Sequence, residues 1–328
     1  MRKVFKKLAA FMLCGVVAAT SCLTGCGSSS NEVVIYSNAD DEAIESIKAA
    51  LDENGYEGKY IIQTFGTSEL GGKLLAEGKN IEADLVTMSS FYLESSQTEN
   101  EMYQELTFET GAVDEYPAYY TPITSQEGAI IVNTEVMADN NLTMPTSLKD
   151  LANAEYKGFL SVTDIQGSST AWLMIQALVN AYGEDGAKEV LAGIYANAGD
   201  HIEDSGSGPI KKVRTGEVAI GFGLRHQAVS DKAEGLPIDF VDPTEGNFAL
   251  TESVAVIDKG DDTNEQAMEM AECIIKNGRD KLIEYYPNPL YEGEEADEEN
   301  ISTYPMTFPE KLTVELLEKH KELSESSK

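Results

Sequence analysis

The sequence predicts an α/β fold built from two units, and three observations indicate it. After residue 33, short apolar runs rich in β-branched residues alternate with amphipathic stretches of helical period, which is typical of helices layered on a mainly parallel sheet. This alternation occurs in two separate clusters. The chain has 328 residues, 42% hydrophobic and 25% charged, which is a globular composition long enough for two domains of about 150 residues.

The first cluster predicts a βαβαβ unit. In its first helix Ile44, Ile47 and Leu51 follow the i, i+3, i+7 spacing that places apolar side chains on one face. The second helix opens with Ser68, a residue type favoured at helix N-caps. Strands are expected at residues 33–37, 59–65 and 84–88, and helices at 40–54 and 68–78.

The second cluster predicts another α/β unit, with strands at 128–133, 159–163, 218–222 and 238–241 and helices at 168–182, 184–197 and 209–215. A long strand at 247–258 and helices at 264–277 and 309–323 predict that the chain then returns to the first unit. Cys273 lies in an apolar stripe with Met270 and Ile274, so we expect it to be a small buried side chain.

The net charge excludes two classes of partner. Lys plus Arg number 24 against 57 Asp plus Glu, which gives −33 and a pI near 4.3. Binding to nucleic-acid phosphates needs clustered cations, so we expect no nucleic-acid partner. An anionic membrane surface is excluded for the same reason.

The N-terminus predicts export and a lipid anchor. Four cations within residues 1–7 precede an apolar run, 8–20, that is too short to span a bilayer, so residues 1–25 are expected to be a signal peptide. The sequence LTGC at 23–26 resembles the lipobox of bacterial lipoproteins, which implies an acylated Cys26, a tether at 26–32 and attachment to the extracytoplasmic face of the cell membrane. The alternative is ordinary secretion with Cys26 incidental.

Seven short segments share their order and spacing with a known family: VVIYS at 33–37, ADLV at 83–86, EGAIIVNT at 127–134, SLKDL at 147–151, YKG at 156–158, SGSGP at 205–209 and GEVAIG at 216–221. Through them the chain resembles the extracellular solute-binding proteins of ABC importers, in the branch that includes ferric-ion, thiamine, phosphonate and sugar-phosphate binders.

The resemblance implies a type II periplasmic-binding-protein fold, in which two α/β lobes are joined by crossing strands and the ligand lies in the cleft. The crossings are expected near 122–126 and 247–253, with lobe 1 at 33–124 and 251–328 and lobe 2 at 125–250. It further implies a monomer that passes a small solute to an ABC permease and its ATPase. That function needs no catalytic residue and no cofactor.

Small polar residues follow each predicted strand of the first unit, directly before a helix. Unpaired N–H groups and the helix dipole collect ligand oxygens at such places, although the same residue types also serve as helix caps alone. By contrast Asp40, Asp41 and Glu42 fill the first turn of helix 40–54, where no anion is expected. The candidate ligand-binding residues are Ser37, Asn38, Thr67, Ser68 and Ser89.

The second unit offers two loops rich in Gly and Ser, at 166–170 and 205–209, each of which opens a helix. Lys211 and Lys212 follow in the first turn of the second of these helices, where a cation opposes the macrodipole unless an anion lies nearby. Their position suggests an anionic ligand, and the alternative is that both point into solvent. The candidates are Ser168, Ser169, Thr170 and Ser207.

The segment after strand 218–222 lies where the ferric-binding relatives carry adjacent tyrosines, and that pair is absent here. Arg225 can form a fork onto phosphate or carboxylate. In sugar-phosphate binders of this branch a His at this position and an acid on the returning strand hold the ligand, which implies His226 and Glu252, with Gln227 beside them. The alternatives are a helix-cap role for His226 and a surface ion pair for Arg225.

The sequence therefore predicts a receptor for a small phosphorylated or phosphonate solute of the sugar-phosphate or aminoethylphosphonate type. One alternative is a cationic solute such as thiamine, a polyamine or ferric ion, which the negative charge favours. Others are a lipoprotein hydrolase and a sensor that reports to a membrane kinase. No metal site is expected, because the three His residues show no zinc-ligand spacing.

Overall fold

The structure is a computed structural model that describes residues 32–296 and 298–328. The expected signal peptide, nearly all of the tether and Cys26 lie outside the described residues. The described strands form one mixed sheet in the order β2-β1-β3-β9-β4-β7-β5-β6, in which β8 pairs with β4 and β10 with β9. The strands are β1 (Val33–Ser37), β2 (Tyr60–Thr64), β3 (Leu85–Ser89), β4 (Thr121–Asn133), β5 (Leu160–Thr163), β6 (Ile202–Glu203), β7 (Ile220–Leu224), β8 (Ile238–Val241), β9 (Asn247–Val256) and β10 (Pro305–Met306).

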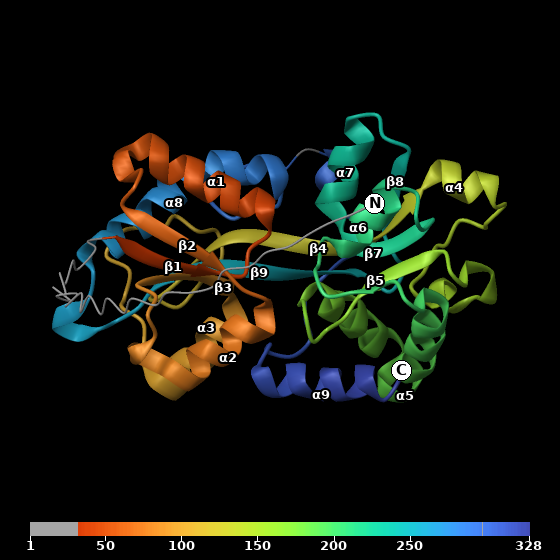
Figure 1. The fold of residues 1–328 in the computed structure, drawn as a ribbon, viewed down its shortest axis with the longest axis horizontal. Coiled ribbons are helices and arrows are strands. Elements are labelled where there is room, and N and C mark those ends of the chain that lie inside the picture. The colour runs from red at the N-terminus through yellow and green to blue at the C-terminus, as the bar shows by residue number, and fades with distance from the viewer. Residues whose placement is uncertain (1–31, 297) are drawn as a thin grey trace, which may run out of the picture. The chain divides into compact units, whose positions relative to one another are not determined.

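Two long strands link two α/β units, which we call lobe 1 (β1 to β3 with their helices) and lobe 2 (β5 to β8 with theirs). The end of β4 pairs with β7 and β8 in lobe 2, while its beginning pairs antiparallel with β9. The end of β9 pairs with β3 in lobe 1. The expected crossing at 122–126 and the expected strand at 128–133 are thus one continuous strand, with a register shift between Pro122 and Thr124. Figure 1 shows β4 and β9 running side by side between the lobes.

Helices cover both faces of the lobe 1 sheet, as the alternating pattern predicts. On one face α1 (Asp41–Leu51) packs against α8 (Glu265–Tyr285), and on the other lie α2 (Thr67–Glu77) and α3 (Ser90–Asn100). The predicted apolar stripe of Ile44, Ile47 and Leu51 is buried. Cys273 is also buried, with its Sγ 3.6 Å from the carbonyl oxygen of Ala50, so its predicted packing role is confirmed.

Lobe 2 carries α4 (Thr134–Asp139), α5 (Thr170–Ala198), α6 (Gly208–Arg214) and α7 (Arg225–Ala233). The two helices expected at 168–182 and 184–197 are the halves of α5. They meet at Gly183, whose φ of +68° is a left-handed backbone conformation that interrupts the helix at little cost only for glycine. No helix among the described residues is long and apolar enough to cross a membrane.

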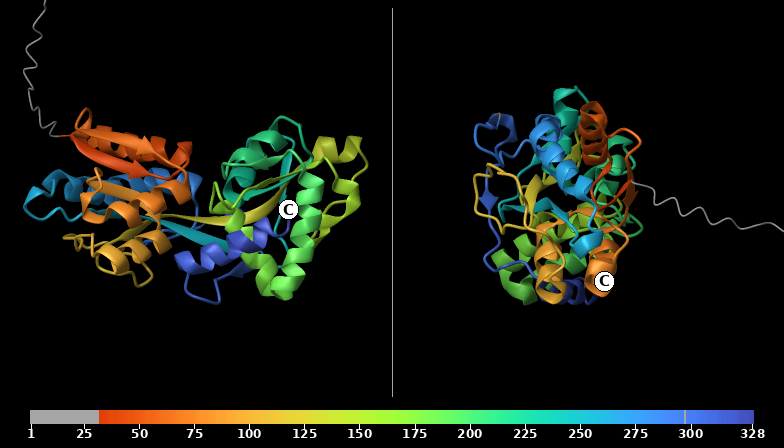
Figure 2. Two further views of the ribbon diagram at one scale, coloured as in Figure 1. Left: turned by 60° about the horizontal axis from the view of Figure 1, so that its bottom comes forward. Right: turned by 90° about the vertical axis from the view of Figure 1, so that its left-hand side faces the viewer.

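The C-terminal segment differs from the expected return to lobe 1. Helix α8 does return, but α9 (Val314–Glu325) packs along α5 of lobe 2 and only touches α3 (Figures 1 and 2). Strand β10 likewise pairs with the first residues of β9. The reason is the inner face of α9: Leu317, His320 and Ser324 are buried, and the last two bond to side chains of α5. Helix α9 therefore packs mainly on lobe 2, although Lys311 before it forms an ion pair with Glu94 of α3.

Candidate ligand-binding cleft

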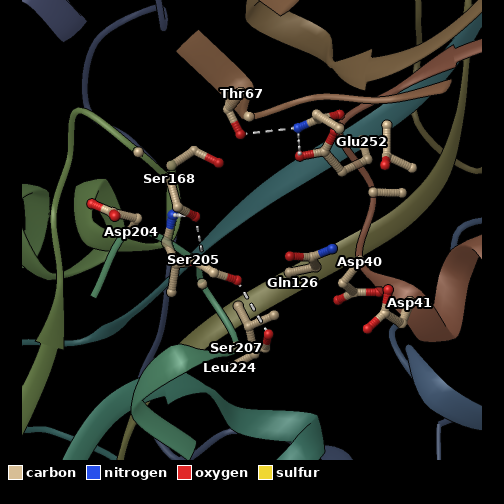
Figure 3. A pocket seen from close by; sticks show the side chains of 18 of the residues that line it. Asp40, Asp41, Thr67, Gln126, Ser168, Asp204, Ser205, Ser207, Leu224 and Glu252 are labelled. Carbon is tan, nitrogen blue, oxygen red and sulfur yellow. Dashed lines mark hydrogen bonds between the residues drawn. The ribbon is translucent and has the colours of Figure 1, made fainter. Parts of the chain in front are cut away.

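A cavity of about 300 Å³ lies between the lobes, at the carboxyl ends of β1 and β2 and at the loops that open α5 and α6. Strand ends and helix beginnings meet there because parallel strands in each lobe point toward the other lobe. Figure 3 shows Ser168, Asp204, Ser205 and Ser207 across the cavity from Thr67, Asp40, Asp41 and Glu252. The other lining residues are Asn38, Ala39, Thr64, Phe65, Gly66, Gln126, Gly167, Ser169, Thr170, Gly206, Lys211 and Leu224.

The lobe 1 wall is built around Glu252 of β9, which is 5% exposed. Its Oε1 accepts hydrogen bonds from Ser89 Oγ at 2.7 Å and from Asn38 Nδ2 at 3.3 Å. The Nδ2 group of Asn38 also donates to Thr67 Oγ1 at 3.1 Å. Within the described residues, neither Glu252 Oε2 nor Asn38 Oδ1 has a hydrogen-bond partner. Burial raises the pKa of Glu252 to about 7.

Two more carboxylates extend this wall. Asp40 caps α1 by accepting from the backbone N–H of Ala43, and it also accepts from the hydroxyl of Tyr286. Burial raises the pKa of Asp40 above its ordinary value. Asp41 lines the cavity beside it. The lobe 1 side is therefore rich in carboxyl and amide oxygens.

The lobe 2 wall consists of two loops packed directly on each other. A Cβ at Gly167 would lie 2.3 Å from the carbonyl oxygen of Asp204, and one at Gly206 would lie 2.3 Å from Thr170 Oγ1, so both positions require glycine. Within the described part of the chain, the backbone N–H groups of residues 205–207 donate to no protein acceptor. This wall offers hydroxyls and backbone donors.

The two lysines of α6 have different surroundings. Lys211 lines the cavity. Lys212 lies outside it and forms ion pairs with Glu217 at 2.6 Å and with Glu203 at 3.6 Å. The sequence suggested that both lysines lie near an anionic ligand. In the structure Lys211 lines the cleft, whereas Lys212 forms ion pairs on the surface.

The cavity brings together seven of the residues expected from the sequence, and six lie elsewhere. Ser37 and Ser89 are buried behind the wall, where Ser37 accepts from Thr87 and from the N–H of Ala39. Ser68 follows Thr67 in α2 and does not line the cavity. The seven lining residues are Asn38, Thr67, Ser168, Ser169, Thr170, Ser207 and Glu252, and the six others are Ser37, Ser68, Ser89, Arg225, His226 and Gln227.

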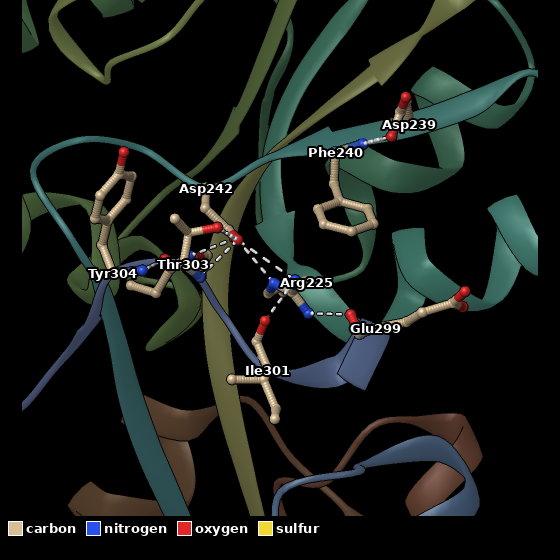
Figure 4. A network of polar contacts seen from close by, with 10 residues as sticks. Arg225, Asp239, Phe240, Asp242, Glu299, Ile301, Thr303 and Tyr304 are labelled. Carbon is tan, nitrogen blue, oxygen red and sulfur yellow. Dashed lines mark hydrogen bonds and ion pairs between the residues drawn. The ribbon is translucent and has the colours of Figure 1, made fainter. Parts of the chain in front are cut away.

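Arg225 is an internal anchor and does not line the cavity that contains Glu252. It is 5% exposed, and its Nε donates to Asp242 Oδ1 at 2.8 Å (Figure 4). Its terminal nitrogens donate to the carbonyl oxygens of Glu299 and Ile301, and its guanidinium lies 4.5 Å from the ring centre of Phe240. The guanidinium of Arg225, which was expected to bind a phosphate with two nitrogens, instead binds the carboxylate of Asp242. Together these two side chains attach segment 298–304 to lobe 2.

His226 and Gln227 line a second cavity of about 330 Å³, between α7 and the lobe 1 residues Glu42 and Tyr285. The His226 ring lies 4.6 Å from that of Tyr286, and burial lowers the pKa of His226 to about 3. Among the described residues, Gln227 Oε1 and Nε2 and His226 Nε2 have no hydrogen-bond partner. These two residues therefore do not face the Glu252 cavity.

Sequence reasoning missed several residues of the lining. Asp40 and Asp41 were predicted only to fill the first turn of a helix, where no anion is expected, and Gln126 only to be part of a crossing strand. The position of the two acids in the sequence could have revealed them, because both follow strand β1, as Asn38 does. Asp204 directly precedes the SGSGP loop. The structure places no group of three or more His, Cys, Asp or Glu side chains suited to a metal within residues 32–296 and 298–328.

Comparison with known proteins identifies the family. The sequence model of the family described as bacterial extracellular solute-binding protein matches residues 78–300. This match covers more than half of the chain, so the chain belongs to the bacterial extracellular solute-binding proteins, which bind small molecules for an ABC permease. An uncharacterised protein of Haemophilus influenzae is 24% identical over 254 residues, which cover 74% of this chain and 72% of the relative.

Solved structures share the fold. AfuA from Actinobacillus pleuropneumoniae, with exogenous fructose-6-phosphate bound, gives a TM-score of 0.73 at 19% identity and covers 90% of this chain and 96% of its own. Iron-bound HitA from Pseudomonas aeruginosa gives 0.70 at 19% identity and covers 90% and 98%. Both are similar in fold to this chain. The predicted type II periplasmic-binding-protein fold is confirmed.

Proposed function

We propose that this protein captures a small phosphorylated or phosphonate organic solute, of the sugar-phosphate or aminoethylphosphonate type, in the Glu252 cavity and delivers it to an ABC permease and its ATPase. The observation that carries the proposal is the lobe 2 wall. Two interlocked Gly/Ser loops present backbone N–H groups and hydroxyls, and Lys211 is the basic side chain among the lining residues. Such donors suit the several oxygens of a phosphoryl or phosphonyl group.

The remaining features of the proposal concern the cell. An acylated Cys26 anchors the chain on the extracytoplasmic face of the membrane, and the tether lets a monomer reach the permease. A single lipidated residue with two acyl chains is enough for stable attachment. The protein binds its ligand without turning it over. Metabolic labelling with a radioactive fatty acid, lost in Cys26→Ser, tests the anchor.

Calorimetric titration of the purified full-length chain tests the ligand class. The probes are fructose 6-phosphate, glucose 6-phosphate, 2-aminoethylphosphonate and inorganic phosphate. At least one organic probe should bind with micromolar or tighter affinity, and Lys211→Ala should weaken it about tenfold, the effect of losing one charge-assisted contact of about 1.4 kcal/mol. Lys212→Ala is the matched control and should leave affinity unchanged. Binding that is equally insensitive to both substitutions would contradict an anion site at this wall.

A cationic solute is the second candidate, and one observation favours it. Asp40, Asp41, Asp204 and Glu252 line the cavity against the single cation Lys211. The fold is also shared by iron-bound HitA. Titration with thiamine, spermidine and ferric citrate decides between the two candidate ligand classes. Tight binding of one of these compounds, with no binding of the phosphorus compounds, would replace the main proposal.

A further inference from the structure

The lobe 1 end of the cavity is a built subsite for hydrogen-bond donors. Glu252 is almost fully buried, and its Oε1 is already satisfied by Ser89 and Asn38. Its Oε2 and Asn38 Oδ1 have no partner in the part of the chain that the structure describes, although both residues line the cavity. A buried acceptor without a donor is costly, so the bound solute is the group placed to supply the protons.

The charge of this subsite selects the kind of donor. Asp40 and Asp41 add two carboxylates to the wall that holds Glu252. A hydroxyl group carries one proton and no charge, so it satisfies one acceptor and compensates no carboxylate. A primary ammonium carries three donors and a positive charge, so it serves both free acceptors and compensates the buried carboxylate.

The two walls therefore differ in what they demand of one ligand. Lobe 2 offers N–H groups, hydroxyls and Lys211 to an anion, whereas lobe 1 offers carboxylate and amide oxygens to a cation. Resting on the function proposed above, we propose that the solute is a small zwitterion, with a phosphoryl or phosphonyl group at lobe 2 and a primary amino group held by Glu252 and Asn38. A cavity of about 300 Å³ accommodates a molecule of this size.

A pair of ligands that differ only in the amino group tests this assignment. The full-length chain is titrated with 2-aminoethylphosphonate and with ethylphosphonate at pH 7.5, where the amine is protonated. We expect 2-aminoethylphosphonate to bind at least 100-fold more tightly. Glu252→Gln should remove most of that difference while leaving ethylphosphonate binding within threefold.

Asp200→Asn is the control, because it removes an exposed carboxylate that does not line the cavity. It should change the affinity for 2-aminoethylphosphonate less than threefold. Thermal unfolding verifies that each variant is folded. Asn38→Ala removes the second acceptor and replaces Glu252→Gln if that variant does not fold, and the comparison of the two ligands on the unaltered chain needs no variant.

The outcomes separate this inference from the proposed function. Equal affinity for the two phosphonates, or tighter binding of a hexose phosphate that Glu252→Gln does not weaken, overturns the amine subsite and leaves the phosphorus-ligand function standing. Binding of spermidine or thiamine with no binding of any phosphorus compound overturns both.

Discussion

The indole Nε1–H of Trp172 donates a 2.6 Å hydrogen bond to Nδ1 of His320, and both side chains are buried. Trp172 lies in the first turn of α5 and His320 in the middle of α9, so the bond joins helices far apart in the sequence. Burial lowers the pKa of His320 to about 4, which keeps the ring neutral and able to accept at physiological pH. The bond fixes the C-terminal helix to lobe 2.

We expect His320→Phe to destabilise the protein by about 1 to 3 kcal/mol, because the indole N–H stays buried without an acceptor. Urea unfolding measures the change. Lys319→Ala is the control, since its side chain is 55% exposed and its ion pair with Glu184 lies on the surface. That variant should stay within about 0.5 kcal/mol. Equal stability of the two variants would show that the bond does not hold α9.

Trp172 is also the chain's single tryptophan, and it contacts the other lobe. Its ring lies 5.0 Å from that of Phe91 in α3, edge to face, and Thr170 two residues away lines the cavity. We expect the emission of Trp172 to change on ligand binding, because hinge motion alters this contact. A fluorescence titration should return the calorimetric dissociation constant, and Phe91→Leu should reduce the amplitude. Unchanged emission in a protein that binds by calorimetry would contradict the expectation.

Arg225→Met is expected to cost about 3 to 5 kcal/mol of stability, because it leaves Asp242 as a buried, uncompensated carboxylate. Ligand affinity in the folded variant should stay within threefold. Lys232→Ala, on the same helix but 53% exposed, should change neither quantity measurably. A stable Arg225→Met protein with lost affinity would restore Arg225 as a ligand residue.

The raised pKa of Glu252 gives stability a defined pH dependence. Between its ordinary value of 4.5 and the raised value of about 7, the native state holds a proton that the unfolded chain has lost, so stability falls as the pH rises. Glu252→Gln removes this fall. The variant should gain up to roughly 3 kcal/mol relative to the unaltered chain between pH 4.5 and 8. Urea unfolding across that range, without ligand, measures it, and a difference that does not vary with pH would contradict the assignment.

Gln227 is predicted to contribute nothing to stability. Its amide is buried with both polar atoms unpartnered among the described residues, so Gln227→Leu should be as stable as the unaltered chain or more stable by up to about 1 kcal/mol. Unfolding and titration measured together test this. A loss of affinity instead would indicate that the second cavity holds part of the ligand.

The sequence predicted the fold well because strand and helix positions depend on local periodicity. The buried stripe of Ile44, Ile47 and Leu51 is an example, and the break at Gly183 is another. The packing of α9 along α5 was not predicted. Periodicity predicts that Leu317, His320 and Ser324 share one face of the helix. It does not predict that Trp172 and Tyr195 of α5 contact this face.

The site was predicted only in part, for a physical reason. Loops that follow strands and open helices converge, so Asn38, Thr67 and Ser168 to Thr170 were found from position alone. For Arg225, position was not sufficient, because its side chain is long and pairs with Asp242, a partner brought close only by tertiary packing. Side-chain direction depends on such partners, which a linear pattern does not contain.

The docking of α9 on α5 has a consequence for the order of folding. Helix α5 is synthesised well before α9, so Trp172 and Tyr195 obtain their hydrogen-bond partners only when His320 and Ser324 emerge. Until then α5 exposes an apolar face with an unsatisfied indole. A growing chain therefore leaves α5 uncovered until α9 is made, and we expect a chain terminated before α9 to be open to proteolysis at α5.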